Sequence, residues 1–280
     1  MNSLSIIKDL FNCNRFLLGD RKRPTHKNKV NLHWWSYSSI DNSELENVGD
    51  LLSPVIVCNM LKTRGIDFDT LIEGTKHLTA IGSALGVGVQ KCTVRGSGCR
   101  QYGYDKRLAL SDYDIRAVRG PKSREVLIQC GHICPEIYGD PAVLLPDFYS
   151  PIPSSEKHIT YIPHFRESQA TYDDVVTLSP LTNDWKAFIN SLTQSELVLS
   201  SSLHGIILAE AYGIPAIWVE SKESSIVPLK YADWYESTGR EVPIPAKNID
   251  FALQIEPPVV PNLSSMRKDL RDSFPFDLWD

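Results

Sequence analysis

The chain has 280 residues, of which 42% are hydrophobic and 22% charged, and its formal net charge is −5. This length suits one large α/β domain or two small ones. The negative charge argues against general nucleic-acid binding, so an anionic ligand would need cations gathered at one site. The longest apolar runs fall short of the roughly 18–20 residues that a membrane span requires.

The N-terminal twenty residues mix acidic and polar residues into their apolar stretch, and they lack the design of a signal peptide. The six cysteines do not suggest a disulfide framework. Cys130 and Cys134 flank a histidine, but no second cysteine pair completes a zinc site, so we expect no metal. We therefore expect a cytoplasmic protein.

A basic run begins at Arg21 and ends at Lys29, broken by Pro24. It is typical of a solvated loop. The alternative is a peripheral contact with anionic lipid head groups at the inner face of the membrane, where each basic residue contributes at most ~1 kcal/mol.

The first half of the chain alternates apolar runs and helical patterns. We expect a helix that starts at Ser53 and Pro54 and ends near Gly65, and another that starts at Pro121 and ends near residue 131. Strands are expected at residues 30–35, 78–81, 92–95 and 113–118. A proline- and serine-rich cluster at residues 146–155 indicates a boundary between domains 1–153 and 154–280.

The second half repeats the alternation. Strands are expected at residues 158–162, 175–179 and 197–200 and after Pro215, and helices at residues 184–193, 203–212 and 263–280, the last broken near Pro275. Strand–helix alternation in both halves predicts an α/β fold with two parallel sheets. Ligands of such sheets bind at the carboxyl ends of the strands.

The most informative segment is residues 197–220, in which three serines and His204 sit between a strand end and a helix start. Such a position exposes backbone N–H groups and the positive end of the helix dipole, which suits an anion. The alternative is that Ser201 or Ser202 only caps the helix and that His204 fills its first turn.

Four other segments accompany this one: residues 47–50 (NVGD), 96–98 (GSG), 116–127 (RAVRGPKSREVL) and 139–146 (GDPAVLLP). In this order and at these spacings the set resembles the polysaccharide pyruvyl transferases. The resemblance implies transfer of a pyruvyl group from phosphoenolpyruvate to two hydroxyls of a sugar, giving a cyclic ketal. It also implies two Rossmann-like domains similar to the glycosyltransferase-B architecture, phosphoenolpyruvate as co-substrate without a further cofactor, and an acceptor that is often a lipid-linked oligosaccharide.

The resemblance also implies a set of site residues. Those for catalysis are His204, Arg119 and Asp50. Those for the donor are Ser201, Ser202, Arg119, His164 and Lys230, and those for the acceptor are Asn47, Gly49, Ser97 and Trp234. We add Arg95 to the donor set as a hypothesis of our own, explained below.

Several roles stay open at the level of sequence. His204 could transfer a proton or hold the donor phosphate. Asp50 could be the base for an acceptor hydroxyl or a helix cap. His164 could face the cleft or lie in a loop, and Trp234 could stack on a sugar or pack in the core.

The chain departs from the family pattern at two positions. Ser202 stands where many members have an arginine, and Arg95 where many have a tryptophan. We therefore hypothesise that Arg95 partly replaces the missing guanidinium.

Two rival functions remain. A glycosyltransferase that uses a nucleotide sugar would share the architecture, but no acidic pair near His204 is spaced to hold a ribose and a base. A non-catalytic sugar-binding protein would not need both Arg119 and His204.

Overall fold

The computed structural model describes residues 30–35, 45–66, 76–87, 89–152, 155, 157–167, 171–221 and 229–280. The basic run between Arg21 and Lys29 lies outside these residues, so its proposed membrane contact stays a prediction.

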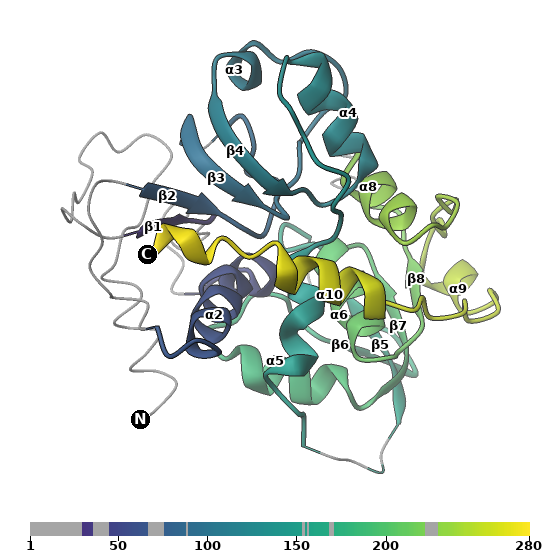
Figure 1. Cartoon of the computed structure of the whole chain (residues 1–280). Coiled ribbons are helices and arrows are strands. Elements are labelled where there is room, and N and C mark those ends of the chain that lie inside the picture. The colour runs from purple at the N-terminus through teal and green to yellow at the C-terminus, as the bar shows by residue number, and fades with distance from the viewer. Residues whose placement is uncertain are drawn as a thin grey trace.

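The described chain forms an α/β fold with two four-stranded sheets, in which all neighbouring strands run parallel. The first sheet has the order β1-β2-β3-β4, with β1 (Val30–His33), β2 (Lys76–Thr79), β3 (Lys91–Arg95) and β4 (Asp112–Ala117). The second has the order β6-β5-β7-β8, with β5 (His158–Ile162), β6 (Val175–Thr177), β7 (Ser195–Ser200) and β8 (Ala216–Trp218). The predicted strands and the Rossmann-like layout of parallel strands and helices are confirmed (Figure 1).

Helices follow most of the strands. They are α2 (Val48–Lys62), α3 (Lys106–Ala109), α4 (Pro121–Gln129), α5 (Trp185–Leu192), α6 (Leu203–Ala211), α8 (Leu229–Ser237), α9 (Ile249–Ala252) and α10 (Ser264–Asp272), with 3-10 turns η1 (Pro141–Asp147) and η2 (Phe276–Leu278). No helix among the described residues is both long and apolar enough to cross a membrane.

The predicted start of α2 is wrong. The helix begins at Val48, five residues before Ser53, and Pro54 lies inside it. An interior proline costs roughly 3 kcal/mol because it removes a backbone hydrogen bond and crowds the preceding turn. Leu51, Leu52 and the residues after the proline are buried, and the burial of these apolar side chains offsets that cost.

The largest hydrophobic cluster contains residues from both halves of the chain. Every residue of α6 is buried, so this helix is enclosed on all sides. It packs against η1, β7 and β8, and α2 packs against η1 and α5.

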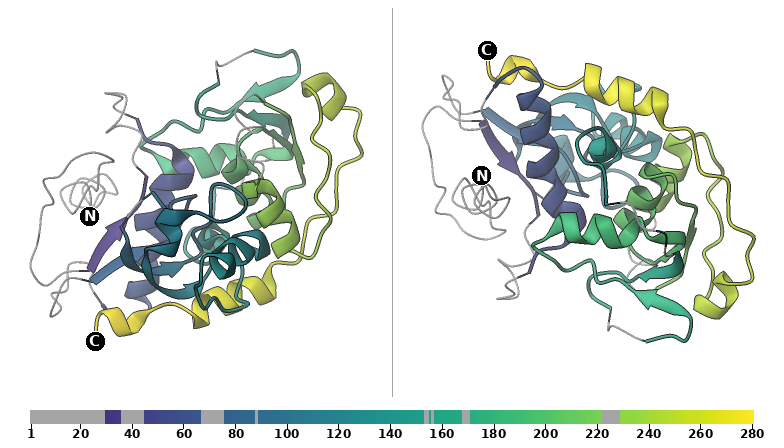
Figure 2. Two further views of the ribbon diagram at one scale, coloured as in Figure 1. Left: turned by 90° about the horizontal axis from the view of Figure 1, so that it is seen from above. Right: turned by 90° about the horizontal axis from the view of Figure 1, so that it is seen from below.

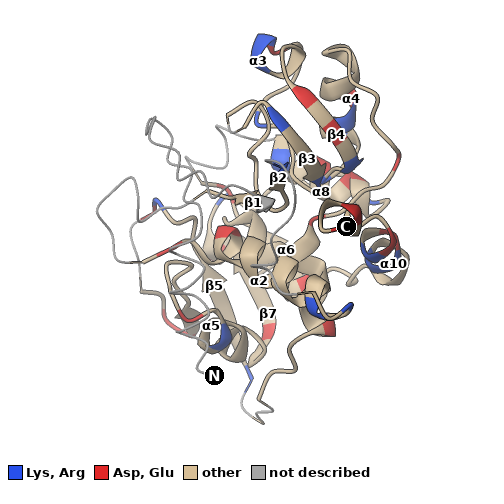
Figure 3. Cartoon of the chain, turned by 60° about the vertical axis from the view of Figure 1, so that its left-hand side comes forward, with Lys and Arg blue, Asp and Glu red and all other residues tan. Residues whose placement is uncertain are grey.

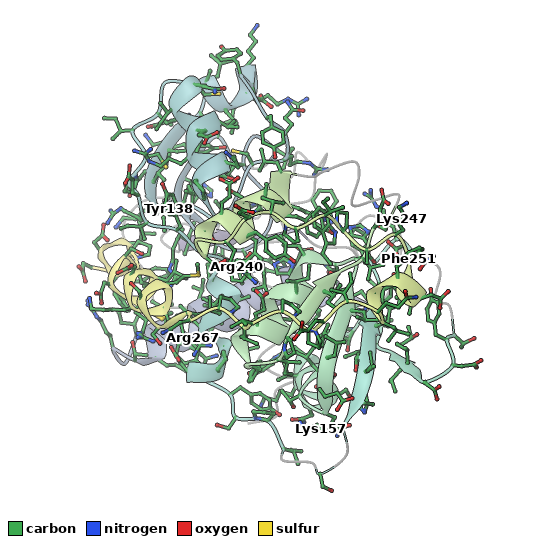
Figure 4. The ribbon with its side chains drawn as sticks, turned by 90° about the vertical axis from the view of Figure 1, so that its right-hand side faces the viewer. Tyr138, Lys157, Arg240, Lys247, Phe251 and Arg267 are labelled. Carbon is green, nitrogen blue, oxygen red and sulfur yellow. The ribbon has the colours of Figure 1, made fainter. Side chains whose placement is uncertain are left out.

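Arginines meet the C-terminal end of α6. Arg240 forms a two-pronged ion pair with Glu210, and Arg267 of α10 donates a hydrogen bond to the carbonyl oxygen of Ala211 (Figure 4). Cations at this end are also stabilised by the partial negative charge of the helix dipole. These contacts occupy the C-terminal end of α6, whereas its N-terminal residues Leu203 and His204 line the cavity described below.

The segment after residue 263 returns to the first half of the molecule. In Figures 1 and 2, α10 and η2 run across the structure until the C-terminus lies near β1 and β2. Lys76 of β2 donates to the carbonyl oxygen of Leu278 at 3.1 Å, and the Arg64 guanidinium lies 3.7 Å from the centroid of the Phe276 ring. The boundary near residue 153 and the two-domain division stay predictions.

Candidate functional site

A cavity of about 150 Å³ lies between the two sheets. Segments that follow β1, β2, β3 and β4 contribute to one side of it, and segments that follow β5 and β7 to the other. Its lining residues are His33, Trp35, Asn47, Asp50, Ile81, Gly82, Ser83, Ala84, Val87, Arg100, Arg119, His164, Phe165, Arg166, Ser202, Leu203, His204 and Lys230. The cavity therefore occupies the carboxyl edges of both sheets, where parallel-sheet proteins bind ligands.

Two helices begin at this cavity. Asn47 precedes α2 and Ser202 precedes α6, and neither side chain forms a capping hydrogen bond. Helix N-termini carry unpaired N–H groups and a partial positive charge. The ends of both helices therefore favour an anion in the cavity.

A buried carboxylate, that of Asp140, faces the imidazole of His204. Nε2 of His204 lies 3.4 Å from Oδ2 of Asp140, and both atoms are buried without a hydrogen-bond partner among the described residues. Oδ1 of Asp140 accepts the backbone N–H of Ala142 at 3.0 Å, which fixes the carboxylate at the start of η1. The pair orients the imidazole as an acidic partner does in other histidine-based sites.

Gly49 packs directly on the imidazole of His204. A Cβ at Gly49 would lie only 1.9 Å from Nδ1, so this position leaves no room for a side chain. Asp50 comes next on α2, and its Oδ2 accepts a hydrogen bond from Nδ2 of Asn47 at 2.6 Å. Burial raises the pKa of Asp50, while His204 and the Asn47 hydrogen bond act in the opposite direction.

Arg119 joins the two halves of the molecule at the cavity wall. Its Nε pairs with Oδ2 of Asp233 at 3.2 Å, Nη1 donates to Oγ of Ser83, and Nη2 donates to the carbonyl oxygen of Cys99. Three of its five N–H groups are used in this way. The side chain is 1% exposed, so any contact with a ligand would involve the remaining N–H groups of Nη1 and Nη2.

The lining carries more cations than carboxylates. Arg100, Arg119, Arg166 and Lys230 line the cavity, whereas Asp50 is the acidic lining residue. Asp233 pairs with Arg119 from behind the wall, and Arg100, Arg166 and Lys230 are the other cations of the lining. Charges on the outer helices are mixed, as α10 shows in Figure 3.

His164 is neutral in this surrounding. Burial, followed by the charges of Lys230 and Arg166, lowers its pKa to about 3. It lines the cavity as predicted, but as an uncharged imidazole at neutral pH.

Other predicted site residues lie behind the cavity wall and support it. Oγ of Ser97 donates to the carbonyl oxygen of Gly82 and accepts from Ala84, which shapes the lining loop. Oγ of Ser201 accepts the backbone N–H of His164. Trp234 is fully buried, and its Nε1 donates to Glu210, so the core alternative for this residue holds.

Arg95 is also placed away from the cavity. It is fully buried, its Nη2 donates to the carbonyl oxygen of Leu270, and its guanidinium lies 4.9 Å from the centroid of the Phe274 ring. Burial lowers its pKa to about 9 despite the neighbouring Asp140. Arg95 therefore does not take the place of an arginine at Ser202, because it faces α10 rather than the donor side.

The comparisons with known proteins identify the family of the chain. Residues 84–223, half of the chain, match the family model described as polysaccharide pyruvyl transferase. The chain belongs to the polysaccharide pyruvyl transferase family.

Two relatives of this pyruvyl transferase family member align over most of their length. The succinoglycan biosynthesis protein ExoV of Rhizobium meliloti (strain 1021) is 29% identical over 241 residues, covering 72% of this chain and 73% of that protein. The uncharacterized protein L143 of Acanthamoeba polyphaga mimivirus is 24% identical over 235 residues, covering 78% and 77%. No solved structure matches the chain.

The structure adds four residues to the predicted site of this pyruvyl transferase family member. Arg100 and Arg166 line the cavity, and Asp140 and Asp233 stand directly behind His204 and Arg119. Arg166 and Arg100 follow strands β5 and β3, a position that signals the ligand edge of a sheet. Asp140 lies in the 139–146 motif, but its partner is 64 positions further on, so no local pattern pairs the two.

Proposed function

We propose that this chain transfers the pyruvyl group of phosphoenolpyruvate to two hydroxyls of a sugar in an exopolysaccharide precursor, forming a cyclic ketal. The observation that carries the proposal is the charge of the cavity. In a chain with a net charge of −5, Arg100, Arg119, Arg166 and Lys230 meet the uncapped starts of α2 and α6 at one small cavity. A phosphate and a carboxylate on one donor fit this arrangement.

The size of the cavity favours a small donor. A cavity of about 150 Å³ is comparable with one that holds a benzene-sized molecule. Drug-sized ligands, among which a nucleotide sugar would count, need about 300–1,000 Å³. Taken by itself, this cavity fits phosphoenolpyruvate better than the rival nucleotide-sugar donor.

The reaction is balanced without a redox partner. Two C–O bonds form between the sugar oxygens and C2 of the donor, and the bond from C2 to the phosphate oxygen breaks. One hydroxyl proton ends on the methylene carbon, which becomes a methyl group, and the other leaves with the phosphate. The enzyme must therefore supply one acid and one base.

We assign these roles to His204 and Asp50. Because Nε2 of His204 faces Asp140, Nδ1 is the nitrogen left to exchange a proton with a substrate. The raised pKa of Asp50 makes its carboxylate a stronger base, suited to accept a hydroxyl proton. Arg166, Lys230 and the free N–H groups of Arg119 would hold the donor anions.

Thermal unfolding with and without ligand tests the donor. Phosphoenolpyruvate at 100 times its dissociation constant should stabilise the fold by about 2.7 kcal/mol and raise the melting temperature, whereas UDP-glucose should not. Arg166→Ala should reduce the rise, and Lys268→Ala, on the exposed face of α10, should leave it unchanged. A rise with UDP-glucose and none with phosphoenolpyruvate would replace this proposal with the glycosyltransferase.

The finer expectations follow from the same proposal. The acceptor would be a lipid-linked oligosaccharide, the enzyme would work in the cytoplasm at the inner face of the membrane, and its two sheets would form glycosyltransferase-B-like domains. The name of the succinoglycan relative supports a role in exopolysaccharide synthesis.

A further inference from the structure

A second cavity, of about 370 Å³, lies on the first half of the molecule. It is formed by the segments that follow β2 and β3, together with the start of α3. Its lining residues are Leu85, Gly86, Val87, Cys99, Arg100, Gln101, Asp105, Arg107 and Leu108. The cavity thus belongs to the carboxyl edge of the first sheet, the same edge that contributes to the donor cavity.

The two cavities adjoin each other. Val87 and Arg100 line both, so a ligand in the second cavity would reach toward the first at these two side chains. The donor cavity, at about 150 Å³, leaves little space for a sugar beside a donor. A reaction between two substrates needs neighbouring sites of this kind, because the reacting atoms must approach within roughly 3–3.5 Å.

The second cavity offers donors and acceptors suited to hydroxyl groups. The guanidinium of Arg107 has no hydrogen bond or ion pair with a described residue. Nε2 of Gln101 donates to Oδ2 of Asp105 at 3.2 Å, which leaves the amide oxygen of Gln101 as an acceptor. Oδ1 of Asp105 accepts the backbone N–H of Arg107 at 2.7 Å and holds this segment in shape.

Apolar side chains complete the lining. Leu85 and Leu108 are buried, at 3% and 2% exposure, so half-buried Val87 offers the larger apolar surface for the C–H face of a ring. The lining therefore combines polar groups with a small apolar surface. A pyranose, with C–H faces and a rim of hydroxyls, matches this division.

We propose that the second cavity binds the hexose unit of the acceptor and presents its hydroxyls to the donor across Val87 and Arg100. This inference rests on the proposed function. It moves the acceptor site from Ser97 and Trp234, which are buried, to the loops after β2 and β3.

Ligand-observed NMR tests this site with p-nitrophenyl β-D-glucoside, β-D-galactoside and N-acetyl-β-D-mannosaminide, each added singly in the presence of phosphoenolpyruvate. At least one should bind the wild-type chain. Arg107→Ala should weaken that binding about tenfold or more, since it removes a charged donor. Gln101→Trp should abolish it by filling the cavity from an exposed position. Lys106→Ala, next to Arg107 but outside the lining, is the matched control.

The melting-temperature rise with phosphoenolpyruvate is measured on the same variants and should stay at the wild-type value. If no hexoside binds the wild-type chain, or if Arg107→Ala and Gln101→Trp bind as Lys106→Ala does, the acceptor site is overturned. If a hexoside binds as expected but phosphoenolpyruvate stabilises none of the proteins, the acceptor site stands and the donor assignment fails instead.

Discussion

The imidazole of His204 has two unequal edges. Nε2 is enclosed and faces the carboxylate of Asp140, whereas Gly49 packs on the ring beside Nδ1 and has no side chain that would cover this nitrogen. A carboxylate at Nε2 favours the tautomer that carries its proton there and stabilises the imidazolium once Nδ1 gains a proton. We therefore propose Asp140 as a positioning residue that would act through His204.

Replacing the carboxylate tests this role. Asp140→Asn should lower kcat by roughly 10²-fold or more because the amide can favour the other tautomer, while the affinity for phosphoenolpyruvate stays within a few-fold. Isotope-labelled phosphoenolpyruvate measures the turnover.

Two variants separate this effect from a loss of fold. Arg95 also neighbours Asp140, so Asp140→Asn leaves a buried guanidinium without its counter-charge. Arg95→Met with Asp140→Asn removes both charges and should regain stability but not turnover. Asp147→Asn, at the other end of η1, should leave turnover unchanged, and wild-type kcat in Asp140→Asn would refute the assignment.

Part of the candidate site could be predicted because a strand end places a side chain at the ligand edge, whereas Asn47, Asp50 and Lys230, at α2 and α8, were predicted from the family resemblance. His204, Arg119 and His164 follow strands and do line the cavity. Arg95 is the last residue of β3, at a point where the register with β4 shifts, so strand alternation does not give the direction of its side chain. Its hydrogen-bond acceptor, the carbonyl oxygen of Leu270, lies in α10, 175 positions away.

At the scale of elements, a buried ion pair joins the segment just before α4 to α8. Asp233 of α8 pairs with Arg119 and accepts hydrogen bonds from the backbone N–H and the hydroxyl of Ser123 in α4. Burial raises the pKa of Asp233, and Arg119 and Ser123 act against this rise. The junction fixes the guanidinium of Arg119 at the cavity wall.

Breaking one side of this pair should be costly. Asp233→Ala leaves Arg119 buried and unpaired, which we expect to lower the free energy of unfolding by about 3–5 kcal/mol in urea denaturation. Glu125→Ala removes the ion pair between Glu125, whose side chain is 55% exposed, and Lys122. This change should lower the free energy of unfolding by at most ~1 kcal/mol. Equal losses in the two variants would show that the junction does not depend on the buried pair.

The elements themselves were largely predictable. Short apolar runs predicted the strands of both sheets, and those at residues 78–81 and 92–95 are also followed by glycines. The i, i+3, i+4, i+7 spacing from Trp185 to Leu192 predicted α5. The start of α2 was not predictable from capping rules, because tertiary burial on both sides of Pro54 outweighs the preference of proline for a helix start. The 3-10 turn η1 and the short helices α3 and α9 lack a periodic signal.

At the scale of the whole molecule, buried histidines make stability depend on pH. Burial is the main cause that lowers the pKa of His33 to about 4 and that of His164 to about 3. In the unfolded chain both titrate near 6.5. The unfolded state therefore binds more protons between these values, and the stability that is complete above pH 6.5 is lost as the pH falls toward 4 and 3.

The expected loss at His164 is roughly 2 kcal/mol between pH 6.5 and pH 5. His164→Gln should flatten this part of the stability curve, measured by urea denaturation at a series of pH values. The raised pKa values of Asp50 and Asp233 make stability fall with rising pH, in the wild-type chain and in His164→Gln alike. Their contribution therefore cancels when the two stability curves are subtracted. His158→Gln, at the start of β5 and outside the cavity lining, is the control; curves that stay parallel would exclude the contribution of His164.

The return of the segment after residue 263 to the first sheet bears on how the chain matures during synthesis. Leu270, Phe274, Phe276 and Trp279 belong to the same hydrophobic cluster as the residues of α2. During synthesis, strands β1 to β4 leave the ribosome long before these side chains do. Part of the apolar surface of the first half therefore stays exposed until the C-terminal segment has been made. The sheet translated first would then be among the last parts of the molecule to become resistant to proteolysis.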